Sequence, residues 1–260
     1  MDGRVDPERI AHVTKVTGGP DVACFQEVAE NFDSLTGSAG ENQPEILAAL
    51  FPGYSAHFAV AVDVPDGKGG RRRFGNLILS RLPVHQVLRH SLPWPPEAGV
   101  PSMPRVALEA VVEAPWGPVS VVTTHLEYFS ARQRAAQVER LCELHAERSR
   151  HAIARPAHKS GPFEPFDRPA ASILTGDFNM PPEDPLVARL RAEWTDAWQV
   201  AHPGVAHPAS FGVYDPQFAS EPYCCDFVFV TQDLAPRIAA VRIDQETQAS
   251  DHQPVIVEFR

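Results

Sequence analysis

Acid, amide and imidazole residues stand at the boundaries of the apolar, β-branched runs of this chain, and that arrangement limits the folds open to it. In chain order they are Gln26-Glu27, Thr124-His125-Leu126, Gly176-Asp177-Phe178-Asn179, Asp226 and Ser250-Asp251-His252. Short apolar runs rich in β-branched residues are typical of buried strands. In α/β proteins the strand ends bring side chains from distant parts of the chain together. The order therefore predicts an α/β fold with one polar cluster at its central strand ends.

The composition is that of a globular chain with a sizeable core. Of the 260 residues, 43% are apolar and 22% are charged, which is close to the usual proportions of soluble domains. The net charge of −10 argues against a protein that mainly grips long nucleic acid, because such affinity comes largely from Lys and Arg on phosphates. A small phosphorylated substrate is not excluded, since a bound metal ion would supply positive charge locally.

No segment indicates secretion or membrane insertion. The N-terminal residues 1–6 lack the apolar stretch of a signal peptide, and no apolar run approaches the ~20 residues that a membrane helix needs. None of the four cysteines forms a C-x-x-C pair, which favours reduced thiols. We therefore expect a monomeric cytoplasmic protein without stable membrane insertion.

Strands and helices are predicted to alternate along the chain. Asp6 and Pro7 are a suitable N-cap and first residue for a helix through about Val16. Further helices are expected over 45–50, 131–151 and 184–194, hairpins over 55–79 and 105–124, and strands over 22–25, 173–175, 226–231, 241–243 and 254–259. No repeat or domain break is visible, so we expect one domain over 1–260. A two-sheet core with helices outside would bury the strands on both faces.

These motifs, with Gly75-Asn76-Leu77-Ile78-Leu79-Ser80-Arg81 and Phe227-Val228-Phe229-Val230, resemble the endonuclease/exonuclease/phosphatase superfamily. That superfamily includes DNase I-like nucleases, apurinic-site endonucleases, inositol polyphosphate 5-phosphatases and neutral sphingomyelinases. Each motif alone is weak, but six in order over residues 2–260 are specific. The resemblance implies a DNase I-like, four-layer α/β/β/α sandwich, in which helices flank two packed mixed β-sheets.

The resemblance also implies a metal-dependent site. Glu27 would be the principal ligand of Mg²⁺ or Mn²⁺, with Gln26 behind it and a further contact from Asp251, direct or through water. Carboxylate oxygens suit Mg²⁺, which keeps several waters and takes few protein ligands. Asp177 would position or deprotonate the attacking water, and Asn179 would donate to a phosphate oxygen.

The histidines are expected to complete this site. His252 could activate water as an imidazole, or stabilise the pentacoordinate phosphorus as an imidazolium. Asp226 would bind its other ring nitrogen and fix the tautomer. By resemblance His125 contacts the scissile phosphate, and Asn76 is a further substrate-side donor. Whether Asp177 or His252 takes the proton of the water stays open.

Each of these residues, taken singly, also has a plain structural explanation. Glu27 could be a surface acid at a strand end, Asp177 and Asn179 could form an Asx turn, and His125 could be a hydrogen-bonded residue closing a strand. The ordered set favours catalysis over these explanations.

We therefore predict a divalent-metal-dependent phosphoesterase that hydrolyses a phosphodiester by in-line attack of water. The substrate would be a nucleic acid, a nucleotide or a phospholipid headgroup. The strongly basic face of a nuclease is missing, with Arg71-Arg72-Arg73 the one tight basic cluster. A phosphomonoesterase or a sphingomyelinase-like phospholipase C is the alternative. An alternative of another class is a catalytically impaired binding module on the same scaffold.

The start of the chain departs from the superfamily. Members usually begin with a strand whose Asn helps to complete the metal site, whereas residues 1–6 here resemble the loop after that strand. We interpret this as a start codon assigned too far downstream. The alternative is a protein that tolerates the loss with weakened metal binding, and this departure is the feature that favours a binding module.

Overall fold

The computed structural model describes residues 6–154, 156–214 and 221–260. The helices are α1 (Pro7–Val16), α2 (Gln43–Leu50), α3 (Ala131–Ile153), α4 (Pro185–Arg191) and α5 (Ala197–Ala201). The strands are β1 (Val22–Glu30), β2 (Ser55–Pro65), β3 (Arg71–Ser80), β4 (Val84–Ser91), β5 (Val106–Ala114), β6 (Gly117–His125), β7 (Ser172–Asp177), β8 (Thr195–Asp196), β9 (Asp226–Val230), β10 (Ile238–Ile243) and β11 (Val255–Phe259). The departure from the superfamily at residues 1–5 lies outside the described residues.

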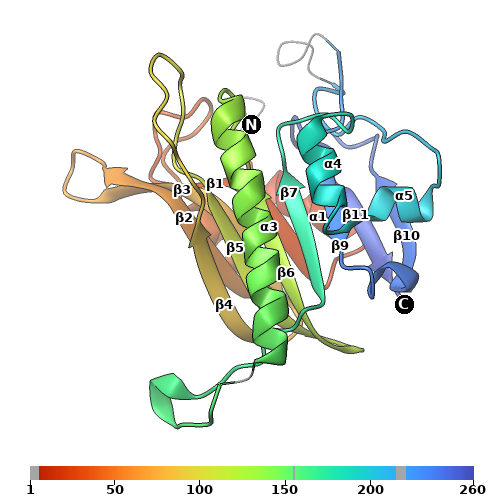
Figure 1. The fold of residues 1–260 in the computed structure, drawn as a ribbon. Coiled ribbons are helices and arrows are strands. Elements are labelled where there is room, and N and C mark those ends of the chain that lie inside the picture. The colour runs from red at the N-terminus through yellow and green to blue at the C-terminus, as the bar shows by residue number, and fades with distance from the viewer. Residues whose placement is uncertain (1–5, 155, 215–220) are drawn as a thin grey trace.

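The described strands form a six-stranded sheet and two smaller ones (Figure 1). The large sheet has the order β4-β5-β6-β7-β9-β8 and is mixed, because β6 and β7 are parallel and their other neighbours are antiparallel. The smaller sheets, β1-β3-β2 and β10-β11, are antiparallel.

Apolar side chains hold four layers together. Between the sheets, Ile78 of β3 packs with Leu108 and Val121 of the six-stranded sheet. The outer face of that sheet is covered by α3 and α4, and the outer face of the three-stranded sheet by α1 and α2, through buried residues such as Val138 and Leu47. This is the α/β/β/α sandwich expected from the sequence.

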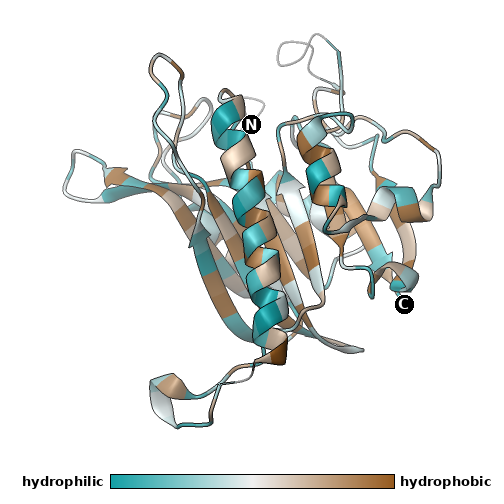
Figure 2. Cartoon of the chain, in the orientation of Figure 1, coloured by the Kyte–Doolittle hydropathy of each residue, from teal (hydrophilic) through white to brown (hydrophobic). Residues whose placement is uncertain are grey.

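Local sequence explains where the helices begin and which face they bury. Asp6 caps α1 by accepting a hydrogen bond from the Arg9 backbone N–H at 2.9 Å, as predicted. In α3 the expected apolar stripe of Val138, Leu141, Cys142 and Leu144 is buried. Figure 2 shows hydrophilic residues along much of the opposite face of α3. None of the described helices is long and apolar enough to cross a membrane.

β1 and β11 are two of the edge strands of the described sheets. Among the described strands, β1 pairs only with β3 and β11 pairs only with β10.

Candidate active site

Three adjacent strands place polar residues in a row at one end of the six-stranded sheet. His125 closes β6 opposite Asp177 at the end of β7, and Asp177 is opposite Asp226 at the start of β9. The Nε2 atom of His125 lies 3.3 Å from Oδ2 of Asp177. Register alone therefore gathers three candidate residues that are far apart in the sequence.

Gly176 permits this close arrangement of β6 and β7. Its φ is +142°, and a Cβ atom added there would lie 1.9 Å from the carbonyl oxygen of Thr124. A side chain at position 176 would push the two strands apart directly beside His125 and Asp177. The glycine of the Gly-Asp-x-Asn motif is thus required by packing.

His252 is oriented by a short hydrogen-bonded series. Its Nδ1 lies 2.9 Å from Oδ2 of Asp226, and the same oxygen accepts a hydrogen bond from the Ser210 hydroxyl at 2.7 Å. The ring of Phe211 packs 4.7 Å from the His252 ring. The Nε2 atom then lies 3.9 Å from Oδ2 of Asp177. The position of Asp226 behind His252 agrees with the tautomer-fixing role expected from the sequence.

Glu27 reaches the site from the facing sheet through a β-bulge. The pairing of β1 with β3 shifts register between Phe25 and Val28, and Glu27 adopts a left-handed φ of 58°. Such a bulge redirects a side chain. The carboxylate Oε1 lies 4.0 Å from Nδ1 of His125, and the Glu27 side chain is 37% exposed. The bulge therefore turns this acid toward the polar row while keeping it open to solvent.

Burial and charge shift the proton affinities of the central pair. Burial raises the pKa of Asp177 above its ordinary value, while the His252 charge opposes this effect and the Asp226 charge adds to it. Burial alone would lower the pKa of His252, but Asp226 first and Asp177 next raise it to about 10. These contacts favour the protonated form of His252 and disfavour the ionised form of Asp177.

His125 has the opposite character. Burial first, and the charge of Arg105 next, lower the pKa of His125 to about 3, so the ring is neutral at pH 7 and carries one N–H donor. Its buried Nδ1 has no hydrogen-bond partner among the described residues. Arg105 is itself buried, with Nε 3.4 Å from Oε2 of Glu127. The neutral ring can thus donate one hydrogen bond without adding charge.

Glu27 is ionised at neutral pH. Burial disfavours its charged form, but nearby positive charge, including that of His252, outweighs burial and lowers the pKa of Glu27 to about 2. A carboxylate that is ionised and partly open to solvent is a suitable ligand for a hard cation.

The two predicted asparagines, Asn179 and Asn76, differ in their distance from the central residues of the site. The Asn179 backbone N–H donates to Oδ1 of Asp177 at 2.8 Å, and its amide Nδ2 donates to the carbonyl of Leu126. The amide of Asn76 instead donates to the carbonyl of Val106 at 2.9 Å and is 3% exposed. Asn179 therefore joins the site, whereas the recorded contact of Asn76 is with the backbone of the facing sheet.

Asp251 and Gln26 flank the central residues. Asp251 is buried, accepts from the Ser250 hydroxyl at 3.1 Å, and is one of the charges that raise the pKa of His252. Gln26 donates to the Thr123 hydroxyl at 2.8 Å, which fixes the residue next to Glu27 across the two sheets.

Three possible metal-ligand side chains also lie close together in a combination that the sequence did not indicate. One ligand atom each of Asp177, Cys225 and His252 lies within 4.8 Å of the others. Burial raises the pKa of the Cys225 thiol well above its ordinary value, so this sulfur stays protonated at pH 7. The oxygens of Glu27 and Asp177 fit Mg²⁺ or Mn²⁺ better than this thiol does.

Sequence reasoning missed Ser210 and Arg105. Ser210 lies in a loop with no strand or helix periodicity, and its role depends on the pairing of residue 211 with residues 223 and 252. Arg105 stands just before β5, where a charged residue at a strand start is ordinary. Only its burial, at 6% exposure, shows that Arg105 differs from an ordinary charged residue at a strand start.

Comparisons with known proteins identify the family. The model of the endonuclease/exonuclease/phosphatase family matches residues 4–252, and the chain belongs to that family. Its fold is similar to a mannosyl-6-phosphatase, Bt3783, of Bacteroides thetaiotaomicron VPI-5482, with a TM-score of 0.69 and 17% identity over 96% of this chain and 89% of that one.

Two further structures illustrate the range of the family. An endonuclease/exonuclease/phosphatase from Beutenbergia cavernae DSM 12333 is 26% identical, with a TM-score of 0.64 over 98% of this chain and 66% of that one. The 3′ phosphatase NExo from Neisseria, bound to a product DNA hairpin, is 20% identical, with a TM-score of 0.62 over 97% and 94%. No curated protein matches the sequence significantly. Family membership supports a phosphoesterase activity for this chain.

Proposed function

We propose that this protein is a divalent-metal-dependent hydrolase of phosphodiesters that uses in-line attack of water. The observation that carries the proposal is the series Ser210–Asp226–His252, whose imidazole ends 3.9 Å from Asp177. A protonated imidazole beside a carboxylate of near-neutral pKa supplies an acid and a base in one place. Hydrolysis of a phosphate ester needs both, one to accept the water proton and one to stabilise charge on phosphate oxygens.

The charge of the site supports the need for a metal ion. The carboxylates of Glu27, Asp226 and Asp251 outnumber the His252 imidazolium even when Asp177 is protonated, and the guanidinium of Arg105 is already paired with Glu127. An anionic substrate would be repelled by this balance. Mg²⁺ or Mn²⁺, held by Glu27 with Asp251 directly or through water, would supply the positive charge that binds the phosphate and stabilises the transition state.

The side chains take distinct roles in this proposal. Asp177 orients the attacking water and accepts its proton while the P–O bond to the leaving alcohol breaks, because the contacts of His252 favour its protonated form. The His252 imidazolium donates to a phosphate oxygen, and the neutral His125 ring positions Asp177. Asn179 offers its second amide N–H to the phosphate, since the first binds the Leu126 carbonyl.

A diester is favoured over a monoester by the shortage of cations. A phosphodiester carries one negative charge and a monoester carries about two at neutral pH. Arg105 is 6% exposed and paired with Glu127, so little charge is left to neutralise a dianion. A phosphomonoesterase is the second candidate, because two structures of similar fold are named as phosphatases.

The test is a set of chromogenic esters with added Mg²⁺ or Mn²⁺. We expect release of p-nitrophenol from bis-p-nitrophenyl phosphate, and a loss of about 10²-fold or more in kcat for His252→Ala and Glu27→Ala. Extra metal should partly restore only Glu27→Ala. His85→Ala is the matched control, because this exposed imidazole pairs with Glu113 on β5, outside the site.

Three results would contradict the proposal. Equal activity in all four proteins would remove the site assignment. Faster hydrolysis of p-nitrophenyl phosphate than of the diester would establish the phosphomonoesterase instead. Absence of turnover on every ester, together with metal-dependent binding of one of them, would identify a binding module.

The proposal also includes a compartment, an oligomeric state and a domain organisation. All four cysteines are free thiols, which supports a reducing compartment such as the cytoplasm. We propose one domain over 1–260 that acts as a monomer. A sedimentation experiment that found a stable dimer would contradict the oligomeric state.

A further inference from the structure

Two neighbouring aromatic side chains are exposed at the active-site end of the molecule. Tyr128 and Phe129 follow closely after the strand that ends in His125. They are 50% and 61% exposed, and their rings meet edge to face with centroids 4.9 Å apart. Apolar residues exposed singly are ordinary, whereas contiguous ones mark binding surfaces. The catalytic roles proposed above use neither ring.

The turn that carries the two rings is held from several sides. Arg134 of α3 donates to the carbonyl oxygens of Glu127 at 2.7 Å and of Tyr128 at 3.0 Å. The Phe129 N–H donates to Oε1 of Glu127 at 2.9 Å, and the Glu127 N–H donates to Oε1 of Gln137 at 2.9 Å. A turn fixed in this way binds a ligand at small entropic cost, because little backbone freedom is lost on binding.

The same turn is joined to the polar row of the site. The Leu126 N–H donates to the carbonyl of Asp177 at 2.9 Å, and the Leu126 carbonyl accepts from the Asn179 amide at 2.8 Å. Tyr128 is three residues beyond His125, so their Cα atoms are at most about 10 Å apart. A ligand that reaches the catalytic residues with its phosphate can therefore contact this turn with a neighbouring group.

A third ring extends the aromatic surface toward His252. Tyr223 packs against Phe211 with ring centroids 5.6 Å apart, and Phe211 packs against His252. Burial raises the pKa of the Tyr223 phenol, and the side chains of Asp177 and Tyr128 are near enough to add to this effect. Aromatic surface therefore continues from the turn to the support of the catalytic imidazole.

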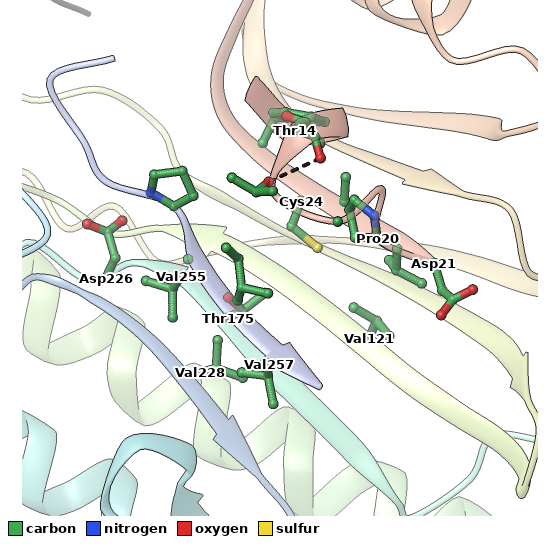
Figure 3. Close-up of a pocket in the computed structure, with 18 of the residues that line it drawn as sticks. Thr14, Pro20, Asp21, Cys24, Val121, Thr175, Asp226, Val228, Val255 and Val257 are labelled. Atoms are coloured by element: carbon green, nitrogen blue, oxygen red, sulfur yellow. Dashed lines mark hydrogen bonds between the residues drawn. The ribbon is translucent and has the colours of Figure 1, made fainter. Parts of the chain in front are cut away.

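The other border of the site has a different character. A groove of about 730 Å³ lies on the inner face of the six-stranded sheet, and Figure 3 shows Asp226 at one end of it, with Thr175, Val228 and Val255 nearby. The aromatic turn instead leads from β6 into α3, which covers the outer face of that sheet. The turn thus borders the site on the side toward α3. A polar site with an aromatic border fits a ligand that has a charged part and a flat part.

We propose that Tyr128 and Phe129 form a stacking platform for a nucleobase, so that the substrate is a nucleotide diester or a short single-stranded oligonucleotide. The assignment rests on the proposed function, because the platform selects the ester that the site hydrolyses. The edge-to-face contact with Phe129 braces the Tyr128 ring, and half of Tyr128 remains exposed for stacking. Every base has a π face, so stacking is tolerant of sequence.

Charge and ring geometry favour a base over other ligands. The net charge of −10 disfavours long nucleic acid, whereas stacking of a single base requires no basic surface. A quaternary ammonium headgroup is recognised by a cage of several ring faces. Tyr128 and Phe129 instead present one edge-to-face pair, with an interplanar angle of 88°.

The test uses three diesters that share p-nitrophenol as the leaving group. They are the p-nitrophenyl ester of thymidine 5′-monophosphate, p-nitrophenyl phosphorylcholine and methyl p-nitrophenyl phosphate. We expect the wild type to prefer the thymidine ester over the methyl ester by about tenfold in kcat/KM. Tyr128→Ala should lose this preference while its rate on the methyl ester stays unchanged, and Tyr128→Phe should retain the preference.

Phe163→Ala is the matched control. Phe163 is also exposed, at 66%, but it belongs to the segment after α3, which Figure 1 shows beyond the end of α3 that is away from the site. Its substitution should leave the three rates unchanged. Tyr128→Ala should also melt at the temperature of the wild type, which separates a lost stacking surface from a loosened turn.

A binding measurement separates this proposal from the proposed function. Calorimetric titration with thymidine 5′-monophosphate and with 2-deoxyribose 5-phosphate, each with Mg²⁺, should show about tenfold tighter binding of the nucleotide. The difference should disappear in Tyr128→Ala. If no ester is hydrolysed but this difference is found, the platform is supported and the proposed function is contradicted.

Four results overturn the platform. Equal kcat/KM of the wild type for the thymidine and methyl esters would show that the base is not bound. An equal loss on both esters in Tyr128→Ala would show that the ring acts on a part common to both. A preference for the phosphorylcholine ester that Tyr128→Ala abolishes would assign the rings to a quaternary ammonium group. Binding to phosphatidylcholine vesicles that Phe129→Ala abolishes would assign them to a membrane surface.

Discussion

At the scale of single residues, the contact between Asp226 and His252 controls the charge of the site. Asp226 is the main group that raises the pKa of His252, against the effect of burial. Asp226→Asn keeps the shape but removes the charge. We expect the pKa of His252 to fall toward or below its ordinary value, so that the ring becomes neutral at pH 7. The rate should fall by about 10²-fold or more at pH 7, and the alkaline limb of the pH profile should move to lower pH, while protonation of Asp177 limits the rate in acid.

Ser210 offers a graded version of the same test. Its hydroxyl donates to the Asp226 carboxylate and accepts from the backbone N–H groups of Cys225 and Asp226, each at 3.0 Å. Ser210→Ala should therefore lower kcat by less than Asp226→Asn does, while shifting the pH profile in the same direction. A pH–rate series on both variants, with NMR titration of His252, measures this. A Ser210→Ala profile identical to that of the wild type would contradict the orienting role.

The sequence predicted the members of the site better than their contacts. His125, Asp177 and Asp226 could be predicted because each sits at the boundary of a β-branched run, and the register of adjacent strands then aligns them. Ser210 could not be predicted in this way, because it lies in a loop whose conformation no local sequence pattern specifies. The bulge at Glu27 is also invisible in the sequence, because it arises from a register shift against β3.

At the scale of elements, a buried ionic cluster fastens α3 to the six-stranded sheet. Glu109 of β5 is fully buried and binds Arg148 of α3 at 3.1 Å, Arg168 at 2.8 Å and His90 of β4 at 2.9 Å. Burial opposes ionisation of Glu109, but these three partners together hold its pKa well below the ordinary value. The Glu109 carboxylate therefore links β5 to α3, to the segment that contains Arg168 and to the edge strand β4.

Removing that charge should destabilise the protein strongly. Glu109→Gln would leave two buried guanidinium groups without their counter-charge, at a cost of about 3–5 kcal/mol. A depressed pKa contributes stability above the unfolded value of about 4.3, and that stability is lost as the pH falls through the folded value. The difference between variant and wild type should therefore be largest near neutral pH and shrink in acid. Chemical denaturation at several pH values tests this.

The control for that prediction lies on the same strand. Glu113 of β5 pairs with His85 at the surface, so Glu113→Gln should change stability by less than about 1 kcal/mol. A loss as large as that of Glu109→Gln would show that position on β5, and not burial of the charge, determines the effect.

The elements themselves were predicted unevenly. The helix starts at Asp6 and Asp184 followed from capping residues, and the hairpins followed from alternating strands. No strand was predicted over 84–91, where β4 contains two histidines and an arginine. Those polar residues are compatible with a strand because β4 is at the edge of the sheet, where three of its eight residues are exposed and the other five are half-buried.

At the scale of the whole molecule, the net charge of −10 determines how salt affects substrate choice. A basic nuclease loses affinity for DNA steeply as salt is added. Here protein and polyanion repel each other, and salt screens the repulsion. We expect kcat/KM on a duplex oligonucleotide to stay flat or rise between low and moderate NaCl at fixed Mg²⁺, while a small diester is nearly unaffected. A steep fall with salt would indicate a basic binding surface.

The left-handed backbone of Glu27 has a consequence for protein engineering. A residue with a Cβ atom at φ 58° is disfavoured by about 1–2 kcal/mol, whereas glycine adopts this conformation freely. Glu27→Gly should therefore melt at a higher temperature than Glu27→Ala, which lacks the same charge but keeps the Cβ atom, and neither variant should hydrolyse esters, which calorimetry and an ester assay would establish together. At this position, selection for heat tolerance among uncharged residues would favour glycine, which keeps the bulge but carries no carboxylate for a cation.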